Sequence, residues 1–380
     1  MEEVRVVIVG AGPSGIATAG CLAVHEIPSV IIERDDCIAS LWRKRTYDRL
    51  HLHLAKEFCQ LPHFPYGSET PSYISKDGFI KYLDDYVEKF ELRPKFKHEV
   101  ESASFDEEEG KWRLKVRKLD SGEEINYATK YLVVASGEND EMFMPEINGL
   151  ESFEGEVLHS SQYRSGLRFK ENNVLVVGSG NSGMEIAFDL CNHGANASIV
   201  VRSPLHLVSR EIWHLGMLLM RFLPLRLLDA LVLFLCNLKF GNTSKYGIHR
   251  PKEGPFYLKT YTPFYPVMDV GTFSKIKSGE IQVLPSLKSI KGNNNVVFSD
   301  GKVLTFDAIV FATGYRSTIK RWLKSDDYLL GDDGMCKLKY PKHWKGRNGL
   351  YCAGLIGKGI YGSAEDAINI ANDINVALKC

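Results

Sequence analysis

Two glycine-rich segments, each between a short apolar run and a helix-forming stretch, constrain the fold of this chain more than any other feature. In the first segment, residues 4–9 predict a buried parallel strand and residues 16–24 predict a helix. Between them lies the G-x-G-x-x-G pattern formed by Gly10, Gly12 and Gly15. Such glycines permit a tight turn and let the backbone approach a pyrophosphate at the positive end of the helix. The segment therefore predicts a dinucleotide site.

The residues around this first pattern make the prediction more specific. Pro13 and Ser14 lie inside the turn and are assigned to the same site. A second predicted strand, residues 29–32, ends on Glu33, whose carboxylate can accept hydrogen bonds from ribose hydroxyls. Strand, glycines, helix, strand and terminal acid together are far more specific than the glycines alone.

The same pattern occurs again in the middle of the chain. Residues 174–177 and 198–201 predict the two strands. The residues assigned to this second site are Gly178, Gly180, Asn181, Ser182, Gly183 and Arg202. Arg202 occupies the strand-end position of Glu33 and can accommodate a 2′-phosphate, which favours NADP over NAD. The alternative interpretation of Arg202 is a solvated residue at a strand end.

Two unlike sites predict two unlike nucleotides, and the simplest pair is FAD at the first and NADPH at the second, with hydride passing from nicotinamide to flavin. Two further buried-strand patterns agree, within residues 130–140 and 306–315. They end in small-residue turns, Ala135-Ser136-Gly137 and Ala312-Thr313-Gly314. Such turns suit points where the chain crosses between nucleotide-binding domains.

These elements predict an α/β fold with two Rossmann-like dinucleotide-binding domains. We expect a discontinuous FAD domain of residues 1–166 and 317–380, with an NADPH domain of residues 167–316 inserted. The last part predicts a strand at residues 350–353 and a helix beginning near Ser363, whose N-terminus suits the phosphate end of the flavin ribityl chain.

Composition excludes some classes of function. Lys and Arg number 47, as do Asp and Glu, so no net field favours nucleic acid. The eight cysteines include no C-x-x-C pair, which disfavours a disulfide reductase and favours reduced thiols in the cytosol. Residues 212–240 are apolar but are interrupted by charged residues. They predict helices packed over a core, with peripheral membrane contact as the alternative and no spanning segment.

The connector between the two glycine patterns carries a family resemblance. Phe153, Gly155, His159 and Tyr163 match F-x-G-x-x-x-H-x-x-x-Y, the identifying motif of flavin-containing monooxygenases. The segments "SLWRKRTYDRLHLHLAKEFCQLPHFPY", "GNSGMEIAFDL", "FATGYRS" and "MCKLKYPKHWKGRNGLYCAG" resemble the plant YUCCA-type monooxygenases. The resemblance covers nearly the whole chain.

This resemblance implies an activity that composition and spacing do not. It implies oxidative decarboxylation of indole-3-pyruvate to indole-3-acetate, the auxin, with NADPH and O2, through a C4a-(hydro)peroxyflavin. The partners it implies are therefore a small 2-oxo acid and O2. It also places Trp42 at the cofactor and implies that the connector keeps NADP⁺ in place, with His159 favoured as a hydrogen-bonded structural residue and Tyr163 packing or hydrogen-bonding at the domain interface.

One departure concerns the candidate catalytic residue. Many flavin monooxygenases have an asparagine near the flavin where this chain has His53. A histidine there can hydrogen-bond the flavin peroxide. Leucines at residues 50, 52 and 54 alternate with His51 and His53, which predicts that both histidines share one face of a strand. No third ligand accompanies them, so we predict no metal site.

Two other functions remain as alternatives. One is a monooxygenase that acts on nitrogen or sulfur and leaves every substrate carbon in place. The other is a redox sensor that holds FAD and NADPH without turnover. The basic run Arg43-Lys44-Arg45 is interpreted as a solvated or ion-paired cluster and is assigned to neither nucleotide.

Overall fold

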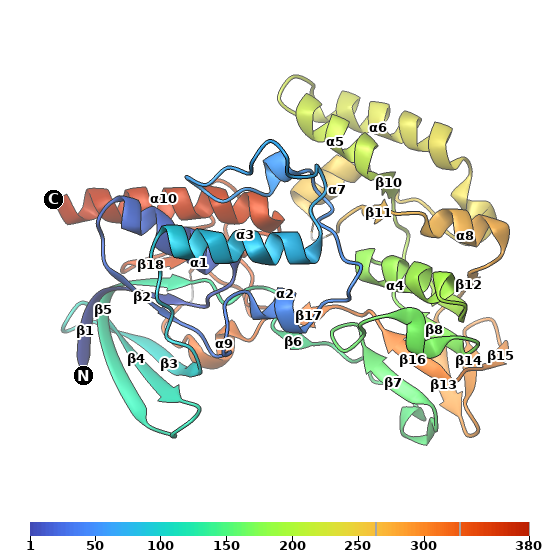
Figure 1. Cartoon of the computed structure of the whole chain (residues 1–380), viewed down its shortest axis with the longest axis horizontal. Coiled ribbons are helices and arrows are strands. Elements are labelled where there is room, and N and C mark those ends of the chain that lie inside the picture. The colour runs from blue at the N-terminus through green and yellow to red at the C-terminus, as the bar shows by residue number, and fades with distance from the viewer. Residues whose placement is uncertain (263, 327, 380) are drawn as a thin grey trace. The chain divides into compact units, whose positions relative to one another are not determined.

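The two glycine patterns lie in different structural units. A computed structural model describes residues 1–262, 264–326 and 328–379, and Figure 1 shows its helices and strands. The first unit contains residues 1–44, 56–141 and 315–380, and the second contains residues 45–55 and 142–314. The chain thus leaves the first unit well before the expected boundary at residue 166. The reason is that β7 (Glu156–His159) pairs with β16 (Ala308–Phe311) in the sheet of the second unit.

The first unit is built on a mixed sheet of order β2-β1-β5-β4-β3, with β18 also pairing with β5. β1, β2, β5 and β18 are mutually parallel, whereas β3, β4 and β5 form an antiparallel meander. The strands are β1 (Glu2–Val9), β2 (Ser29–Ile32), β3 (His98–Asp106), β4 (Lys111–Lys118), β5 (Glu124–Val134) and β18 (Leu350–Cys352). The apolar half of β1 is wholly buried, as expected for a central parallel strand.

The helices of the first unit differ slightly from the sequence prediction. They are α1 (Pro13–Val24), α2 (Ser40–Lys44), α3 (Lys76–Lys89), α9 (Ile319–Trp322) and α10 (Gly359–Lys379), with a 3₁₀ turn at Lys56–Phe58. α1 begins on Pro13 because the first helical position needs no N–H donor. α10 begins four residues before the expected Ser363. α1 contacts both α3 and α10, and the three helices lie together in Figure 1.

The second unit has a five-stranded parallel sheet of order β12-β9-β8-β16-β7. Its strands are β7 (Glu156–His159), β8 (Asn173–Val177), β9 (Asn196–Val200), β12 (Gln282–Leu284) and β16 (Ala308–Phe311). The strands outside this sheet are the parallel pair β10 (Leu207–Ser209) and β11 (Val267–Asp269), and the antiparallel meander β13 (Leu287–Lys291), β14 (Asn295–Phe298) and β15 (Val303–Thr305). The short strands β6 (Glu141–Met142) and β17 (Tyr315–Arg316) lie at two of the four points where the chain changes unit.

The helices of the second unit are α4 (Asn181–Asn192), α5 (Arg210–Leu219), α6 (Leu225–Phe240), α7 (Pro255–Tyr261) and α8 (Thr272–Ser278), with 3₁₀ turns at Leu150–Ser152, Gly166–Phe169 and Thr243–Tyr246. Among these helices, α4 packs against β8 and β9 of the central sheet, and α5 and α6 pack against β10. One large buried cluster joins α4 and β8 to α5 and α6.

The apolar stretch 212–240 forms a pair of helices, as expected. α5 and α6 bury Trp213, Leu228 and Val232 in the core of the second unit, and Figure 1 labels the two helices together. Phe222 and Leu238 remain largely exposed. Among the described residues, the structure has no helix with the length and apolar character needed to cross a membrane.

The strand expected at residues 50–54 does not form. Leu50 N–H donates to the carbonyl of Tyr47 in a turn, and neither a helix nor a named strand includes residues 50–54. This local bonding replaces the alternation that the sequence pattern predicted. The ring of His51 bonds to the carbonyl of Arg49, whereas the ring of His53 lies against Glu185, so the two histidines have separate partners.

Candidate functional site

Each glycine of the first pattern has a distinct steric role. Gly10 has a φ of +109°, and a Cβ there would lie 2.5 Å from the carbonyl oxygen of Ala135. A Cβ on Gly15 would lie 1.9 Å from the carbonyl oxygen of Gly10. Gly12, at the N-terminus of α1, has nothing within 4 Å of its added Cβ. Two glycines thus close the turn, and the third leaves open space where a pyrophosphate would approach the helix.

The carboxylate of Glu33 is held by the same turn. Its Oε2 accepts the N–H of Ala11 at 2.7 Å, and its Oε1 accepts the N–H of Asp35 at 2.8 Å. Glu33 is buried, and burial raises the pKa of its carboxyl, offset in part by these two backbone bonds. Each oxygen keeps a further lone pair, so the expected contact with ribose hydroxyls is compatible with this geometry.

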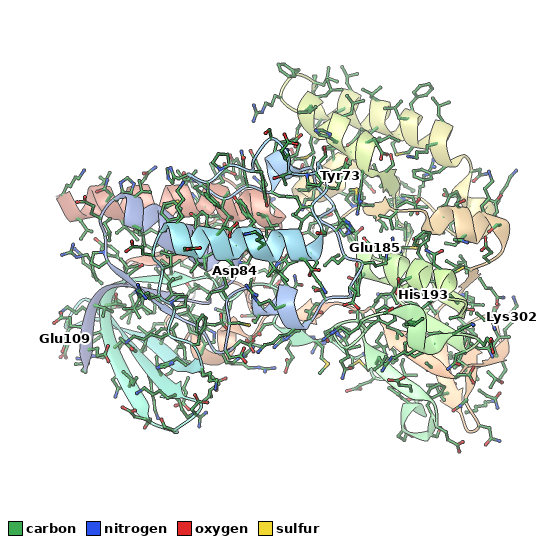
Figure 2. The ribbon with its side chains drawn as sticks, viewed as in Figure 1. Tyr73, Asp84, Glu109, Glu185, His193 and Lys302 are labelled. Carbon is green, nitrogen blue, oxygen red and sulfur yellow. The ribbon has the colours of Figure 1, made fainter. Side chains whose placement is uncertain are left out.

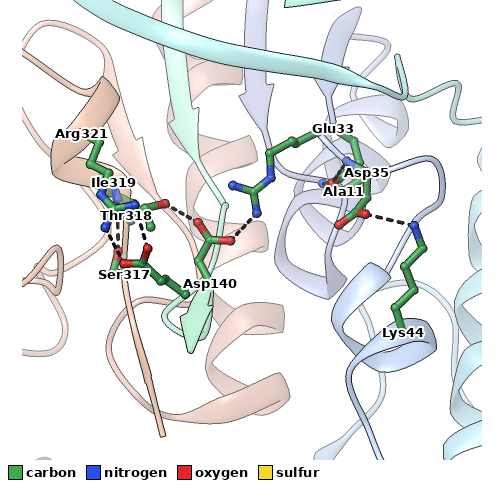
Figure 3. Close-up of polar contacts among 11 residues, drawn as sticks. Ala11, Glu33, Asp35, Lys44, Asp140, Ser317, Thr318, Ile319 and Arg321 are labelled. Carbon is green, nitrogen blue, oxygen red and sulfur yellow. Dashed lines mark hydrogen bonds and ion pairs between the residues drawn. The ribbon is translucent and has the colours of Figure 1, made fainter. Parts of the chain in front are cut away.

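A polar network next to Glu33 was not predicted from the sequence. Arg34 Nη2 lies 2.5 Å from Asp140 Oδ1, and the hydroxyl of Thr318 donates to the other oxygen of Asp140. Figure 3 shows these contacts beside those of Glu33 and Lys44. The network fixes the end of β2 to the segments that follow β5 and precede α9. Only the position of Arg34 beside Glu33 hinted at it in the sequence.

The other residues predicted at this site lie around the same turn. Pro13 is the first residue of α1, and Ser14 Oγ donates to Ser363 Oγ at 2.8 Å. Trp42 lies on α2 and makes an edge-to-face contact with Phe79, 4.7 Å between centroids.

An unsatisfied polar atom lies beyond the end of β5, the strand that pairs with β1. Ser136 Oγ is buried and forms no hydrogen bond within the described residues. A buried hydroxyl normally has a partner, so this atom fits a site that a polar group completes. The open space at Gly12 and the Ser136 hydroxyl together fit a bound FAD.

The second glycine pattern reproduces the first. Gly178 has a φ of +116°, and its added Cβ would lie 2.4 Å from the carbonyl oxygen of Ala312. A Cβ on Gly183 would lie 1.9 Å from the carbonyl oxygen of Gly178, whereas Gly180 again faces open space. The two units therefore contain two dinucleotide turns with the same division of roles.

The flanking polar residues of this second turn have different contacts. Asn181 Oδ1 accepts the N–H of Met268 at 2.8 Å, and Ser182 is the second residue of α4. Arg202 lies two residues beyond the end of β9 and is exposed. Its side chain has no ion pair with any carboxylate in the described residues. An exposed guanidinium after the strand that follows the glycine turn fits a nucleotide with a 2′-phosphate.

The connector motif is part of the second unit itself. Phe153 packs in a buried cluster with Val177 and Phe306. Gly155 is needed because a Cβ there would lie 2.3 Å from the carbonyl oxygen of Asp307. The residues that follow form β7, the edge strand of the parallel sheet. The motif therefore builds a strand beside β16 and is more than a linker.

His159 ties this edge strand to the Ala312-Thr313-Gly314 turn. Its Nε2 lies 3.0 Å from the carbonyl oxygen of Gly314, and its Nδ1 accepts the N–H of Ser161 at 3.2 Å. The ring is fully buried, and burial lowers its pKa, offset in part by the bond to Gly314. The lowered pKa favours the neutral ring, and both ring nitrogens have partners within the second unit. The hydroxyl of Thr313 donates to the carbonyl of Phe143.

Tyr163 contributes a second buried anchor. Its hydroxyl donates to Asp189 Oδ2 at 2.6 Å, and the same oxygen accepts the N–H of Gly166 at 2.8 Å. Burial, followed by the adjacent carboxylate, raises the pKa of the Tyr163 phenol. The tyrosine therefore holds the connector against α4 of the second unit.

His53 has an unexpected acidic partner. Its Nε2 lies 2.7 Å from Glu185 Oε1, and the His53 side chain is 24% exposed whereas that of Glu185 is 1% exposed. Figure 2 labels Glu185 on α4. The phenol of Tyr47 is also buried, and desolvation followed by the charge of Glu185 raises its pKa. The sequence signal for Glu185 was weak: an acid on the apolar face of a helix.

Two further expectations concern charged and metal-binding groups. Arg43 pairs with Asp84, and Lys44 Nζ lies 3.0 Å from Asp35 Oδ1. These two members of the basic run are therefore ion-paired, as predicted. Within residues 1–262, 264–326 and 328–379, no three histidine, cysteine or acidic side chains are grouped to hold a metal ion.

Comparison with known proteins identifies the family. The family model described as FMO-like, flavin-binding monooxygenase-like, matches residues 3–326. The chain is 52% identical to the probable indole-3-pyruvate monooxygenase YUCCA10 of Arabidopsis thaliana, over 99% of this chain and 98% of that protein. It is 46% identical to the indole-3-pyruvate monooxygenase YUCCA1 of Oryza sativa subsp. japonica, over 97% and 91%.

Solved structures show the same fold at low identity. The flavin-containing monooxygenase of Stenotrophomonas maltophilia superposes with a TM-score of 0.73 at 20% identity and covers all of both chains. An open structure of cyclohexanone monooxygenase superposes with a TM-score of 0.73 at 19% identity, over all of this chain and 89% of that one. The α/β fold with two Rossmann-type units is therefore that of flavin monooxygenases. The chain belongs to the flavin-binding monooxygenase-like family, within its YUCCA branch.

Proposed function

We propose that this protein is an FAD- and NADPH-dependent monooxygenase that converts indole-3-pyruvate to indole-3-acetate. The observation that carries the proposal is the pair of matching glycine turns in two units, one with a carboxylate and the other with an arginine after the following strand. The names of the relatives supply the substrate, since the described geometry specifies only the nucleotides.

The first unit provides the contacts proposed for FAD. The N-terminus of α1 receives the pyrophosphate across the open side of Gly12, and Glu33 accepts hydrogen bonds from the adenosine ribose. The Ser136 hydroxyl is one of several buried polar atoms that form no hydrogen bond within the described residues. FAD, when bound, supplies the hydride acceptor and the activation of O2.

The second unit provides the contacts proposed for NADPH. The N-terminus of α4 receives the pyrophosphate at Gly180, and Arg202 pairs with the 2′-phosphate. His159 and Thr313 hold the adjoining turn through the carbonyls of Gly314 and Phe143. The protein thus contributes orientation and charge recognition and leaves the redox chemistry to the nucleotides.

His53 is the side chain proposed to form a hydrogen bond at the reacting oxygen. Its Nε2 is engaged by a buried carboxylate, which fixes the ring and leaves Nδ1 as the other donor or acceptor. Glu185 is then a positioning residue, because it acts on the substrate only through the imidazole.

The proposed reaction consumes one O2 and one NADPH for each 2-oxo acid. Indole-3-pyruvate, O2, NADPH and a proton give indole-3-acetate, CO2, water and NADP⁺. One oxygen atom enters the new carboxylate and the other leaves as water, while the bond between the keto carbon and the original carboxylate breaks. NADPH supplies the two electrons for the water.

Product analysis tests this proposal directly. Purified protein with FAD is given NADPH, air and indole-3-pyruvate, and indole-3-acetate, CO2 and hydrogen peroxide are measured together. We expect acetate to form in step with NADPH loss. NADPH loss with hydrogen peroxide but no indole-3-acetate would reject this substrate and favour a monooxygenase that acts on nitrogen or sulfur. No NADPH loss with any 2-oxo acid would favour the redox sensor.

The cytosol is the proposed location of the protein, and contact of α5 and α6 with a membrane surface is the alternative. The exposed side chains of Phe222 and Leu238 are the observation that keeps the alternative open. Fractionation of tagged protein from its own tissue separates the two, since a cytosolic enzyme stays in the supernatant at low and high salt.

A further inference from the structure

Two cysteines of the first unit that lie outside its glycine turn are in direct contact. The Sγ atoms of Cys336 and Cys352 lie 3.2 Å apart, and neither cysteine is in a disulfide. A disulfide has a sulfur–sulfur distance of about 2.05 Å, so the two thiols are about 1 Å from bonding distance. Cys352 is at the end of β18, which pairs with β5, and Cys336 lies in the irregular segment that precedes it.

The two thiols differ in access to solvent. Cys352 is 1% exposed and donates to the carbonyl oxygen of His343 at 3.1 Å. Its pKa is held well above the usual range, first by its hydrogen bond with Cys336 and then by burial. Cys336 is only partly buried. A dissolved oxidant therefore reaches Cys336 first, and Cys352 is the resolving thiol that reacts with the oxidised Cys336.

We propose that Cys336 and Cys352 are a modification site at which a hydroperoxide forms an intramolecular disulfide. The sulfur of Cys336 attacks one peroxide oxygen and the O–O bond breaks, which gives a sulfenic acid and water. The sulfur of Cys352 then attacks that of Cys336, and the S–O bond breaks with release of a second water. Two thiols and one H2O2 give one disulfide and two waters.

The disulfide removes a hydrogen bond near residues that pack against the nucleotide turn of the first unit. On oxidation Cys352 loses the proton that it donates to His343. The buried ring of His343 lies 2.7 Å from Asp366 Oδ1, and Asp366 Oδ2 accepts the N–H of Gly354 at 2.9 Å. A Cβ on Gly354 would lie 2.2 Å from Ser14 Oγ. Gly354, two residues after Cys352, therefore packs closely against Ser14 of the first glycine pattern.

The source of the oxidant follows from the proposed function, and the site itself does not depend on it. An oxygenase that activates O2 without transferring oxygen releases hydrogen peroxide beside its own chain. The inference rests on the proposed function only in this respect. Because the experiment adds hydrogen peroxide directly, a failure of the substrate assignment leaves its result unchanged.

Peptide mapping of the flavin-loaded protein tests the site. Protein with and without H2O2 is alkylated, cleaved with trypsin and analysed without reduction. The two cysteines fall in separate tryptic peptides, residues 325–337 and 348–358, and neither contains another cysteine. We expect these peptides to become linked, in a yield about tenfold above any other cysteine pair because the thiols are already adjacent. Dithiothreitol should reverse the link.

Three variants sharpen the result. Cys352→Ser should leave a sulfenic acid on Cys336 that dimedone traps, whereas Cys336→Ser should leave Cys352 as a thiol. Cys191→Ser removes another partly buried cysteine, in the other unit, and should not affect linking. Over-oxidation of Cys336 to sulfinic acid without a linked peptide would overturn the proposal. So would equal linking among all exposed cysteines.

Discussion

His53 Nε2 lies 2.7 Å from Oε1 of Glu185, although 132 positions separate the two residues in the chain. The carboxylate is almost completely buried, and the imidazole is its partly exposed partner. A buried carboxylate with no partner is costly, because the loss of its hydration is not compensated. The pair therefore links the stability of the second unit to the residue proposed to face the substrate.

A double-mutant cycle measures this link. We expect His53→Ala to destabilise the protein because it leaves the buried Glu185 carboxylate without its partner. The loss of stability should be much smaller in a Glu185→Gln background. The coupling free energy should be ~1–2 kcal/mol, below that of a fully buried pair because the ring is partly exposed. Denaturant unfolding of the four proteins gives the value. His51→Ala is the matched control, since His51 bonds to a backbone carbonyl.

The glycine turns predict a separation of folding from nucleotide binding. Gly12→Ala places a methyl group in open space, so the apoprotein should unfold at the wild-type denaturant concentration while its FAD content falls severely. Gly15→Ala forces a contact with the Gly10 carbonyl and should destabilise the apoprotein by ~2 kcal/mol or more. Absorbance at the flavin band and denaturant unfolding report the two effects. Equal unfolding midpoints for both variants would contradict this division of roles.

The second turn should respond in the same way to a different nucleotide. Gly180→Ala should keep the bound flavin and raise the KM for NADPH about tenfold or more, because a methyl group occupies the approach to the pyrophosphate. Two quantities are measured on the purified variant: its flavin content, and its initial rate over a range of NADPH concentrations. Loss of flavin from this variant would reverse the assignment of the two units.

Arg202 provides the test of cofactor choice. Arg202→Ser should raise the KM for NADPH and barely change that for NADH, a difference of ~1–3 kcal/mol for a charge-assisted contact. The rates with both nucleotides are compared in the wild type and the variant. A parallel loss with NADPH and NADH would show that Arg202 does not read the 2′-phosphate. Arg168→Ser is a control, because Arg168 is exposed and pairs with Glu156.

The sequence predicted the parts of this molecule whose cause is local. The glycines of both turns are dictated by contacts within the turn and with one neighbouring strand, so their spacing between a predicted strand and a predicted helix identifies them. The strand β2 was predicted at its observed bounds because three consecutive apolar residues, 30–32, precede an acid. The structural role expected of His159 stays a prediction, and its buried, hydrogen-bonded ring is compatible with it.

The missed features depend on contacts between distant residues. Glu185 meets His53 only after residues 45–55 join the second unit, and no local pattern signals that exchange. The strand predicted at residues 50–54 failed because alternation of leucine and histidine does not specify a strand without a sheet edge to pair with. The connector became β7 for the opposite reason, since β16 offered such an edge.

The burial of His159 predicts the direction of a pH effect on stability. Because burial lowers the pKa of its folded form below the ordinary value of about 6.5, the unfolded chain binds a proton that the folded chain does not. The contribution of this histidine is therefore complete above about pH 6.5 and is lost as the pH falls toward the folded pKa. Burial lowers the pKa of His206 in the same direction.

His159→Asn should lower stability at pH 7.5 by ~1–2 kcal/mol, through lost bonds to Gly314 and Ser161. It should also make the decline below about pH 6.5 shallower than in the wild type. Denaturant unfolding at several pH values measures both effects, with the exposed His63→Asn as control. Parallel curves for wild type and His159→Asn would mean that the ring takes up its proton equally in the folded and unfolded chains, and would remove the basis for treating it as a neutral anchor.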